Sequence, residues 1–167
     1  SINNNGILNN YGTITNGGLI ENSKTIDGSG VFTQDAGATI NNGSFSQASF
    51  QINGGEVGGN GSFIGDVTIA SGATVRPGGT LTFNGDFHSS GNLILEIAGT
   101  GTGFYDVLAI NGNADFTGGD VLFVFNNDFH PSVGDHWNFL FSDSITGLDG
   151  LNISFAGLRH GEKVTGD

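Results

Sequence analysis

The chain has 167 residues, carries a formal net charge of −12 and contains only 4 Lys and Arg together. Because binding to phosphates needs clustered Lys and Arg, this composition argues against DNA or RNA as a partner. With no Cys, disulfides, thiol catalysis and cysteine metal sites are excluded, which suits an exported bacterial protein. The 31 glycines predict frequent turns, while 36% hydrophobic residues, with 14 Phe, supply a continuous core.

A six-residue repeat begins with the first residues. A period of six is even, so each unit holds a strand whose alternate side chains face opposite ways, with one apolar residue inward. Asn or Gly between units supplies a corner, because both residues enter the left-handed backbone region readily. The first block places apolar residues at Ile2, Leu8, Ile14, Ile20, Ile26 and Phe32, and asparagines at Asn4, Asn10, Asn16 and Asn22.

The repeat slips within residues 34–43 and returns one residue out of phase, which implies one inserted residue. Three units make a coil of about eighteen residues that climbs roughly 4.8 Å, the spacing of hydrogen-bonded strands. Residues 1–95 are therefore expected to form a solenoid of six-residue units with parallel strands. Its second block places these residues inward: Phe63, Ile69, Val75, Leu81, Phe87 and Leu93.

Asparagines at equivalent positions of successive coils predict a hydrogen-bonded ladder. Asn4 and Asn22 are eighteen residues apart, so stacking places one above the other, inside the coil or at its corner. We expect this ladder to be structural rather than a ligand-binding site.

Residues 96–167 are expected to continue the solenoid and to close it with an aromatic-rich β cap, with Trp137 in its core. A solenoid end exposes strand edges and core side chains, so a terminal element with bulkier residues is required. Ala109–Gly112 has the sequence of a hairpin turn. The predicted fold class is all-β, a parallel β-helix (β-solenoid) with a β-rich C-terminal capping segment. The expected strands of that segment are Leu93–Ile97, Phe104–Ile110, Asp120–Phe125, His136–Phe141 and Leu151–Phe155.

Four segments, together with the Asn- and Gly-rich repeats, resemble the passenger regions of Gram-negative autotransporters and haemagglutinin-like secreted β-helix proteins. They are Gly72–Phe87, Asn92–Ile97, Tyr105–Gly112 and Phe129–Asp135. The resemblance implies a right-handed parallel β-helix, export, display outside the cell, no cofactor and no catalytic residues. The sequence lacks the membrane barrel of an autotransporter, which predicts either a fragment or another export route. Ser1 opens directly into repeat sequence without a signal peptide, so we expect a processed or excised chain.

Polysaccharide lyases and hydrolases share this fold, so catalysis must be judged from candidate residues. A lyase needs a basic residue and cationic or metal neutralisation of its substrate, but the basic residues are scattered. They are Lys24, Arg76, Arg159 and Lys163. Paired carboxylates for glycoside cleavage could meet across coils, although aspartates in turns commonly cap backbone N–H groups. The acidic candidates are Asp66, Asp86, Glu96, Asp106, Asp115 and Asp120. We expect no enzyme, and a polysaccharide-degrading β-helix is the weakest alternative.

A metal site also has few candidates. His130, Asp135 and His136 match no recognised metal spacing, so we expect a surface loop there, and His88 and His160 are isolated. An acidic surface attracts divalent cations. We nevertheless expect a solvated, repulsive surface and no cofactor, with Ca²⁺ binding as the alternative.

Two non-enzymatic functions remain. A structural subunit would stack head to tail into a filament with copies of itself, or with neighbouring segments of a longer chain, because exposed strand edges pair readily. An adhesin would bind a glycan or a host surface through shallow sites whose weak affinity is raised by avidity. We expect a secreted or cell-surface structural or display module, with the adhesin as the alternative.

Overall fold

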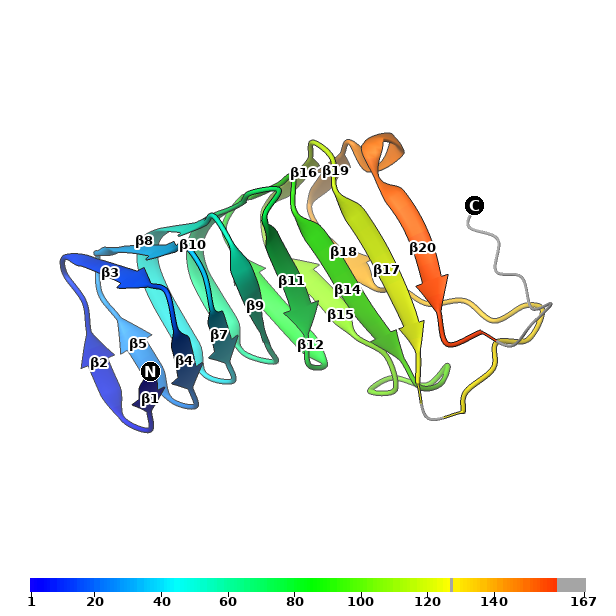
Figure 1. Ribbon diagram of the computed structural model, residues 1–167, viewed down its shortest axis with the longest axis horizontal. Coiled ribbons are helices and arrows are strands. Elements are labelled where there is room, and N and C mark those ends of the chain that lie inside the picture. The colour runs from blue at the N-terminus through cyan, green and yellow to red at the C-terminus, as the bar shows by residue number, and fades with distance from the viewer. Residues whose placement is uncertain (127, 159–167) are drawn as a thin grey trace.

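The computed structural model describes residues 1–126 and 128–158 as one elongated stack of coils (Figure 1). Each strand pairs in parallel with the corresponding strand of the next coil. The described chain is almost entirely strand and turn, with one short 3₁₀ helix at Leu148–Gly150. This architecture is the parallel β-helix predicted from the six-residue period, whereas the handedness of the coil stays a prediction.

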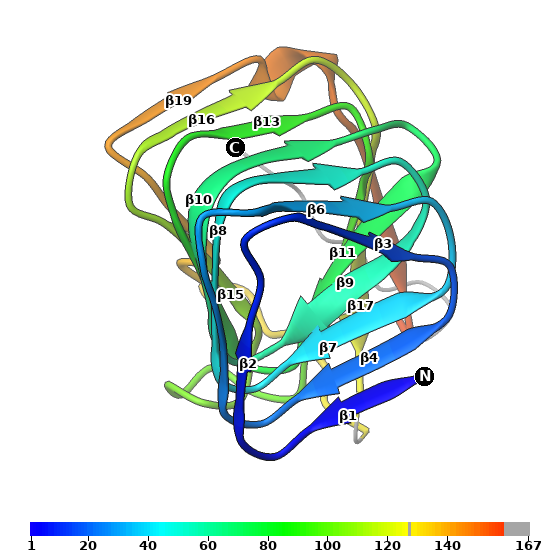
Figure 2. The same cartoon turned by 90° about the vertical axis from the view of Figure 1, so that its left-hand side faces the viewer.

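Each coil has three sides, as the view along the stack shows (Figure 2). The first side is one sheet made of β1 (Ile2–Asn4), β4 (Leu19–Asn22), β7 (Ala38–Asn41), β9 (Gly55–Gly59), β11 (Ala73–Pro77), β14 (Asn92–Ile97), β17 (Asp120–Phe125) and β20 (Asn152–Ala156). The second side holds β2 (Ile7–Asn9), β5 (Thr25–Asp27), β12 (Thr80–Asn84), β15 (Val107–Ile110) and β18 (Leu140–Phe141). The third side holds β3 (Thr13–Asn16), β6 (Val31–Gln34), β13 (Phe87–Ser89), β16 (Asn113–Phe116) and β19 (Ser144–Thr146). Two long strands, β8 (Ser44–Ile52) and β10 (Ser62–Ile69), bend across the second and third sides.

The coils lengthen along the chain. Ile2 pairs with Ile20, eighteen residues later, whereas Asp120 pairs with Asn152, thirty-two residues later. The strands stay in register while the extra residues enter loops at the corners, such as residues 98–106 between β14 and β15. The eighteen-residue coil expected from the repeat therefore describes the N-terminal part of the stack and not its C-terminal part.

The inserted residue of the repeat lies in a turn. Asn16 pairs with Gln34, eighteen residues later, whereas Leu19 pairs with Ala38, nineteen later. The additional residue is thus in the turn 35–37, whose final glycine has φ 75°. An insertion at a corner leaves the strands on both sides in register, so the core pattern resumes immediately.

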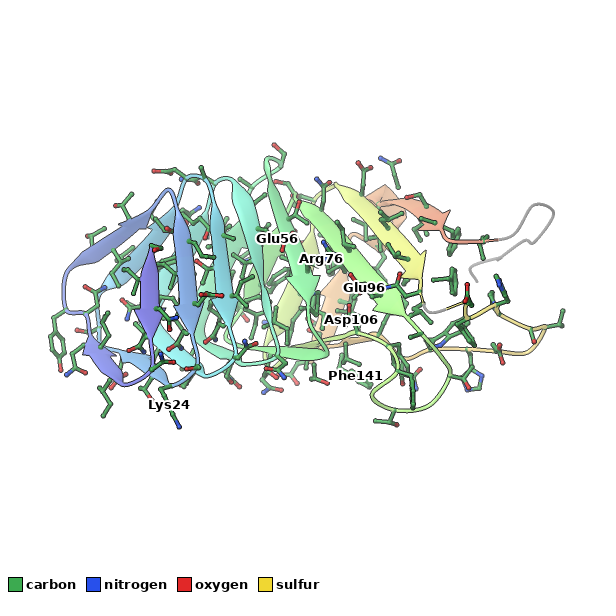
Figure 3. All side chains as sticks on the ribbon, turned by 60° about the horizontal axis from the view of Figure 1, so that its bottom comes forward. Lys24, Glu56, Arg76, Glu96, Asp106 and Phe141 are labelled. Carbon is green, nitrogen blue, oxygen red and sulfur yellow. The ribbon has the colours of Figure 1, made fainter. Side chains whose placement is uncertain are left out.

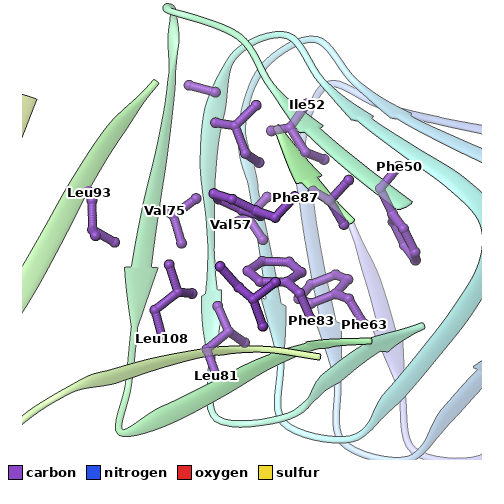
Figure 4. Close-up of a cluster of buried hydrophobic side chains, with 14 of the residues drawn as sticks. Phe50, Ile52, Val57, Phe63, Val75, Leu81, Phe83, Phe87, Leu93 and Leu108 are labelled. Atoms are coloured by element: carbon purple, nitrogen blue, oxygen red, sulfur yellow. The ribbon is translucent and has the colours of Figure 1, made fainter. Parts of the chain in front are cut away.

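The core is a continuous column of apolar side chains. Phe63 stacks on Phe45 and on Phe83, with ring centroids 5.7 Å and 5.3 Å away. Figure 4 shows Phe63 and Phe83 within this column. Nine of the predicted core residues are buried: Ile20, Ile26, Phe32, Phe63, Ile69, Val75, Leu81, Phe87 and Leu93.

The first coil buries its core positions less completely. Leu8 and Ile14 are partly buried, and Ile2 is 38% exposed, contrary to its expected place in the core. The physical reason is that the first coil packs against another coil on one side only in this structure. The outward-facing Ile7 is 78% exposed.

Strand positions in the C-terminal part differ from the sequence expectation. β15 begins at Val107 rather than Phe104, and β18 contains only Leu140 and Phe141. The predicted hairpin at Ala109–Gly112 is wrong, because β15 and β16 lie on different sides and pair with neighbouring coils. Its Asn-Gly pair instead forms a coil corner. β20 pairs in parallel with β17, so the coils continue through this segment.

Candidate functional site: polar ladders and a cleft beside Asp106

A ladder of buried asparagines joins the first three coils. Nδ2 of Asn4 donates to Oδ1 of Asn22 at 2.7 Å, and Nδ2 of Asn22 donates to Oδ1 of Asn41 at 2.7 Å. Each amide also donates to a backbone carbonyl in the following coil. Because buried amides must be hydrogen-bonded, this ladder fixes how one coil sits on the next.

The other two asparagines of the predicted ladder pair with glutamines. Nδ2 of Asn16 donates to Oε1 of Gln34 at 3.0 Å. Nδ2 of Asn10 reaches past the second coil to Oε1 of Gln47 at 2.5 Å. Gly30 leaves room for this contact, since a Cβ there would lie 2.4 Å from Nδ2 of Asn10. Neither glutamine was predicted to join the ladder, because among the side-chain amides only asparagines recur with the six-residue step. The relevant sequence signal is any side-chain amide, Asn or Gln, at a corner position.

Several of the acidic candidates join coils at the surface. Oδ1 of Asp66 accepts from the backbone N–H of Asp86 at 3.0 Å, and Oδ1 of Asp86 accepts from the backbone N–H of Asn113 at 2.9 Å. Oδ1 of Asp120 accepts from Nδ2 of Asn152 at 3.0 Å. Each contact links one coil to the next. In each contact the carboxylate accepts a hydrogen bond from an N–H group, which is the capping role expected for Asp86.

Asp115 lies between two other coils on the third side. Its Oδ1 accepts from Oγ1 of Thr146 at 2.7 Å, and its Oδ2 is 3.5 Å from Nδ1 of His88. The hydrogen bond from Thr146, followed by the contact with His88, lowers the pKa of Asp115. His88 is therefore not isolated, as the sequence suggested, but part of a row along β13, β16 and β19.

Arg76 and Glu96 form an ion pair on the outer face of the first side (Figure 3). Arg76 donates through Nε and Nη2 to Oε1 of Glu96, and Nδ2 of Asn126 donates to Oε2 of the same carboxylate at 2.8 Å. The hydrogen bond to Glu96 raises the pKa of Arg76. Lys24 is exposed in an early coil, so the two basic residues Lys24 and Arg76 are far apart along the stack (Figure 3).

In the part of the chain that the structure describes, no group of three His, Asp or Glu side chains could hold a metal ion. His130, Asp135 and His136 therefore do not form such a group. Asp135 instead accepts from the backbone N–H of Ser132 at 2.8 Å, within its own loop. Three further candidates lie outside the described residues: Arg159, His160 and Lys163.

Trp137 lies in an aromatic cluster of the C-terminal part. Its ring centroid is 5.9 Å from that of Phe125 and 6.1 Å from that of Phe129. Its Nε1 donates to the backbone carbonyl of Gly99 at 2.9 Å. The expected core position of Trp137 is confirmed in part, because the side chain is half-buried and also holds the 98–106 loop in place.

A cleft of about 290 Å³ opens beside this loop, at the corner between the first and second sides. Phe104 is 61% exposed although its loop is held at several points. Phe104 was predicted to lie in a strand, whereas it lies in the loop before β15, and the cleft was not predicted from the sequence. The signal that could have indicated a loop is the loss of the six-residue step after Ile97. The main lining residues are Gly79, Glu96, Phe104, Tyr105, Asp106 and Asn126.

Asp106 anchors the loop to β14 and to the turn between β11 and β12. Its Oδ1 accepts from the backbone N–H of Gly79 and its Oδ2 from that of Glu96, both at 2.8 Å. The side chain is 7% exposed. Burial raises the pKa of Asp106, against the opposing effect of the two N–H groups. Because both oxygens are hydrogen-bonded to backbone, this carboxyl holds structure at the cleft, the capping role expected from its turn context.

The fold and these contacts define a parallel β-helix stabilised by stacked polar side chains. No family model matches the chain, and no curated protein or solved structure matches it. The resemblance to autotransporter passengers therefore stays a prediction that rests on the sequence segments. Within residues 1–126 and 128–158, no helix has the length and apolar character needed to cross a membrane.

Proposed function

We propose that this chain is a non-catalytic structural module of a bacterial secreted protein, displayed outside the cell. The observation that carries the proposal is the use of its polar side chains, since buried amides and surface carboxylates join one coil to the next. Stacked coils make a quasi-one-dimensional body whose length grows with the number of coils, which suits a spacer. The resemblance of the C-terminal segments to secreted passengers supports the same role and location.

A test of catalysis can use one surface carboxylate. Asp86 binds Asn113 of the next coil, whereas Asp27 is an exposed aspartate on β5. The purified protein is expected to leave pectin, alginate and host glycans intact. Asp86→Ala should lower the urea midpoint of unfolding, and Asp27→Ala should leave it within error. Turnover of a polysaccharide that disappears in Asp86→Ala, with the fold retained, would overturn the non-catalytic proposal.

Location can be tested directly in the source bacterium. Antibodies raised against the folded chain should label intact cells or detect the protein in the culture supernatant. Labelling that requires permeabilised cells would contradict display outside the cell. An antibody against a cytoplasmic protein, which should label only permeabilised cells, is the control.

The partners that we propose are further coils stacked on the ends, and the unequal ends bear on their identity. Ile2 and Ile20 are eighteen residues apart, whereas Asp120 and Asn152 are thirty-two apart. In a head-to-tail contact between copies, a short N-terminal coil would meet a longer C-terminal coil, so only part of the longer coil would be paired. This mismatch favours neighbouring segments of a longer chain over a self-assembled filament. Electron microscopy of the purified 167-residue chain should show single particles at high concentration; long filaments would reverse this preference.

A further inference from the structure

We propose that the cleft beside Asp106 binds a single residue of a neutral glycan. This binding site goes beyond the structural role, which needs no ligand, and it supplies the adhesin alternative with a location. The cleft combines an exposed aromatic ring, a hydrogen-bonded carboxylate and amide, and a corner that contains glycine. Its volume of about 290 Å³ lies near the lower limit of small-ligand sites, which fits one sugar residue.

The aromatic ring is held on a fixed loop. The backbone N–H of Ala98 donates to the carbonyl of Phe104 at 2.7 Å, and the N–H of Phe104 donates to the carbonyl of Gly101 at 3.0 Å. Asp106 and Trp137 attach the same loop to the coils. An exposed ring that is held in place loses little conformational entropy on binding. The C–H face of a pyranose can therefore pack on Phe104.

The polar groups of the cleft are oriented in advance. Arg76 binds Oε1 of Glu96, and Asn126 binds Oε2, so the carboxylate plane is fixed from both ends. A fixed carboxylate accepts hydrogen bonds from sugar hydroxyls. The side-chain oxygen Oδ1 of Asn126 offers a second acceptor. Asp106 contributes less, because both of its oxygens already accept backbone N–H groups.

Charge selects against acidic sugars. Glu56, Arg76 and Glu96 follow one another on the neighbouring strands β9, β11 and β14 (Figure 3), and Asp106 lies on the loop after β14, so three of these four charged residues are acids. The whole chain also carries a formal net charge of −12. Uronic and sialic acids would be repelled by this field, while neutral hexoses would not. A site this small gives weak affinity, in the millimolar range, unless many copies bind together.

The test is an NMR titration of the ¹⁵N-labelled 167-residue chain with glucose, galactose, mannose and N-acetylglucosamine, and separately with galacturonic acid. At least one neutral sugar should shift the amide signals of Gly79, Phe104 and Asn126, and galacturonic acid should shift them less. Phe104→Ala should weaken binding by about tenfold, the scale of one aromatic contact. Tyr11→Ala removes another exposed aromatic ring, in the first coil, and should bind like the wild type.

Three results would overturn the proposal: no shift at the cleft with any neutral sugar, stronger binding of galacturonic acid, or unchanged binding by a folded Phe104→Ala variant. Circular dichroism checks the fold of both variants. Failure of sugar binding would leave the structural proposal standing, because surface labelling tests that proposal independently. Sugar binding together with labelling confined to permeabilised cells would support the glycan site and contradict display outside the cell.

Discussion

Asn22 donates a side-chain hydrogen bond to Oδ1 of Asn41 at 2.7 Å, although the two residues are nineteen positions apart in a repeat of eighteen. The ladder survives the insertion because the extra residue lies in the turn 35–37, on a different corner. Register inside this β-helix is thus set by side-chain amides at one corner while another corner absorbs a change of length.

Replacement of Asn22 by Ala should destabilise the N-terminal coils by about 2–4 kcal/mol, because Nδ2 of Asn4 and Oδ1 of Asn41 each lose one hydrogen-bond partner in a buried site. Urea denaturation followed by circular dichroism measures the effect. Asn9→Ala, at an exposed position of β2, is the matched control and should stay within about 0.5 kcal/mol of the wild type. Equal midpoints for the two variants would mean that the ladder does not stabilise the fold.

Gly37 should not tolerate a side chain. Its φ is 75°, and a Cβ would lie 1.9 Å from the carbonyl oxygen of Gly18 in the coil below. Gly37→Ala is expected to lower the free energy of unfolding by more than the roughly 1–2 kcal/mol that a left-handed backbone alone costs. The reason is that the turn must also move away from Gly18 to make room for the Cβ. Gly6→Ala is the control, since a Cβ there meets nothing within 4 Å. A pair of thermal melts distinguishes the two, and a Gly37→Ala midpoint at or above that of Gly6→Ala would contradict the steric argument.

The sequence was sufficient for the period, the parallel strands and most of the core. Val75 and Leu81 are buried because alternate side chains of a strand face the core, and an even step of six returns to the inward face each time. The length of the later coils could not be predicted in this way. After Ile97 the chain leaves the step of six, and no local rule states that Val107 will return to pair with Thr80.

The cleft was missed for the same reason. Phe104 and Asp106 are neighbours of Val107 in sequence, and the apolar run suggested one strand. The loop is held because Asp106 accepts the backbone N–H of Gly79, in the turn between β11 and β12, and the backbone N–H of Glu96 on β14. These two donors lie 27 and 10 positions away from Asp106 in the sequence. The turn context of Asp106 predicts that it caps N–H groups, but a single sequence does not indicate that distant Gly79 and Glu96 supply them. These contacts position the loop that carries the exposed ring.

The stacked phenylalanines should dominate the stability of the middle coils. Phe63 is 1% exposed and contacts the rings of Phe45, Phe50 and Phe83. Phe63→Ala removes these contacts and leaves a cavity, so we expect a loss of about 3–5 kcal/mol. Phe141→Ala, on a ring that is 51% exposed, should cost less than half as much. Comparable losses in urea denaturation would show that the column is not the main source of stability.

Asp106 should give the protein a distinctive dependence of stability on pH. Burial raises its pKa above the ordinary value of 3.8, so the folded state keeps this proton to a higher pH than the unfolded state does. The contribution of this group to stability therefore rises as the pH falls through the folded pKa, and it is lost as the pH rises above it.

Asp106→Asn tests this dependence, because its side chain stays neutral throughout. At neutral pH the variant should be less stable by about 1–3 kcal/mol, since the amide offers one accepting oxygen to the two N–H donors of Gly79 and Glu96. As the pH falls from neutral towards 3.8, the wild type should gain stability relative to the variant. Urea midpoints at a series of pH values measure the difference, with Asp27→Asn as the exposed control. A difference that shrinks on acidification would mean that the two N–H groups outweigh burial and that the pKa of Asp106 is lowered.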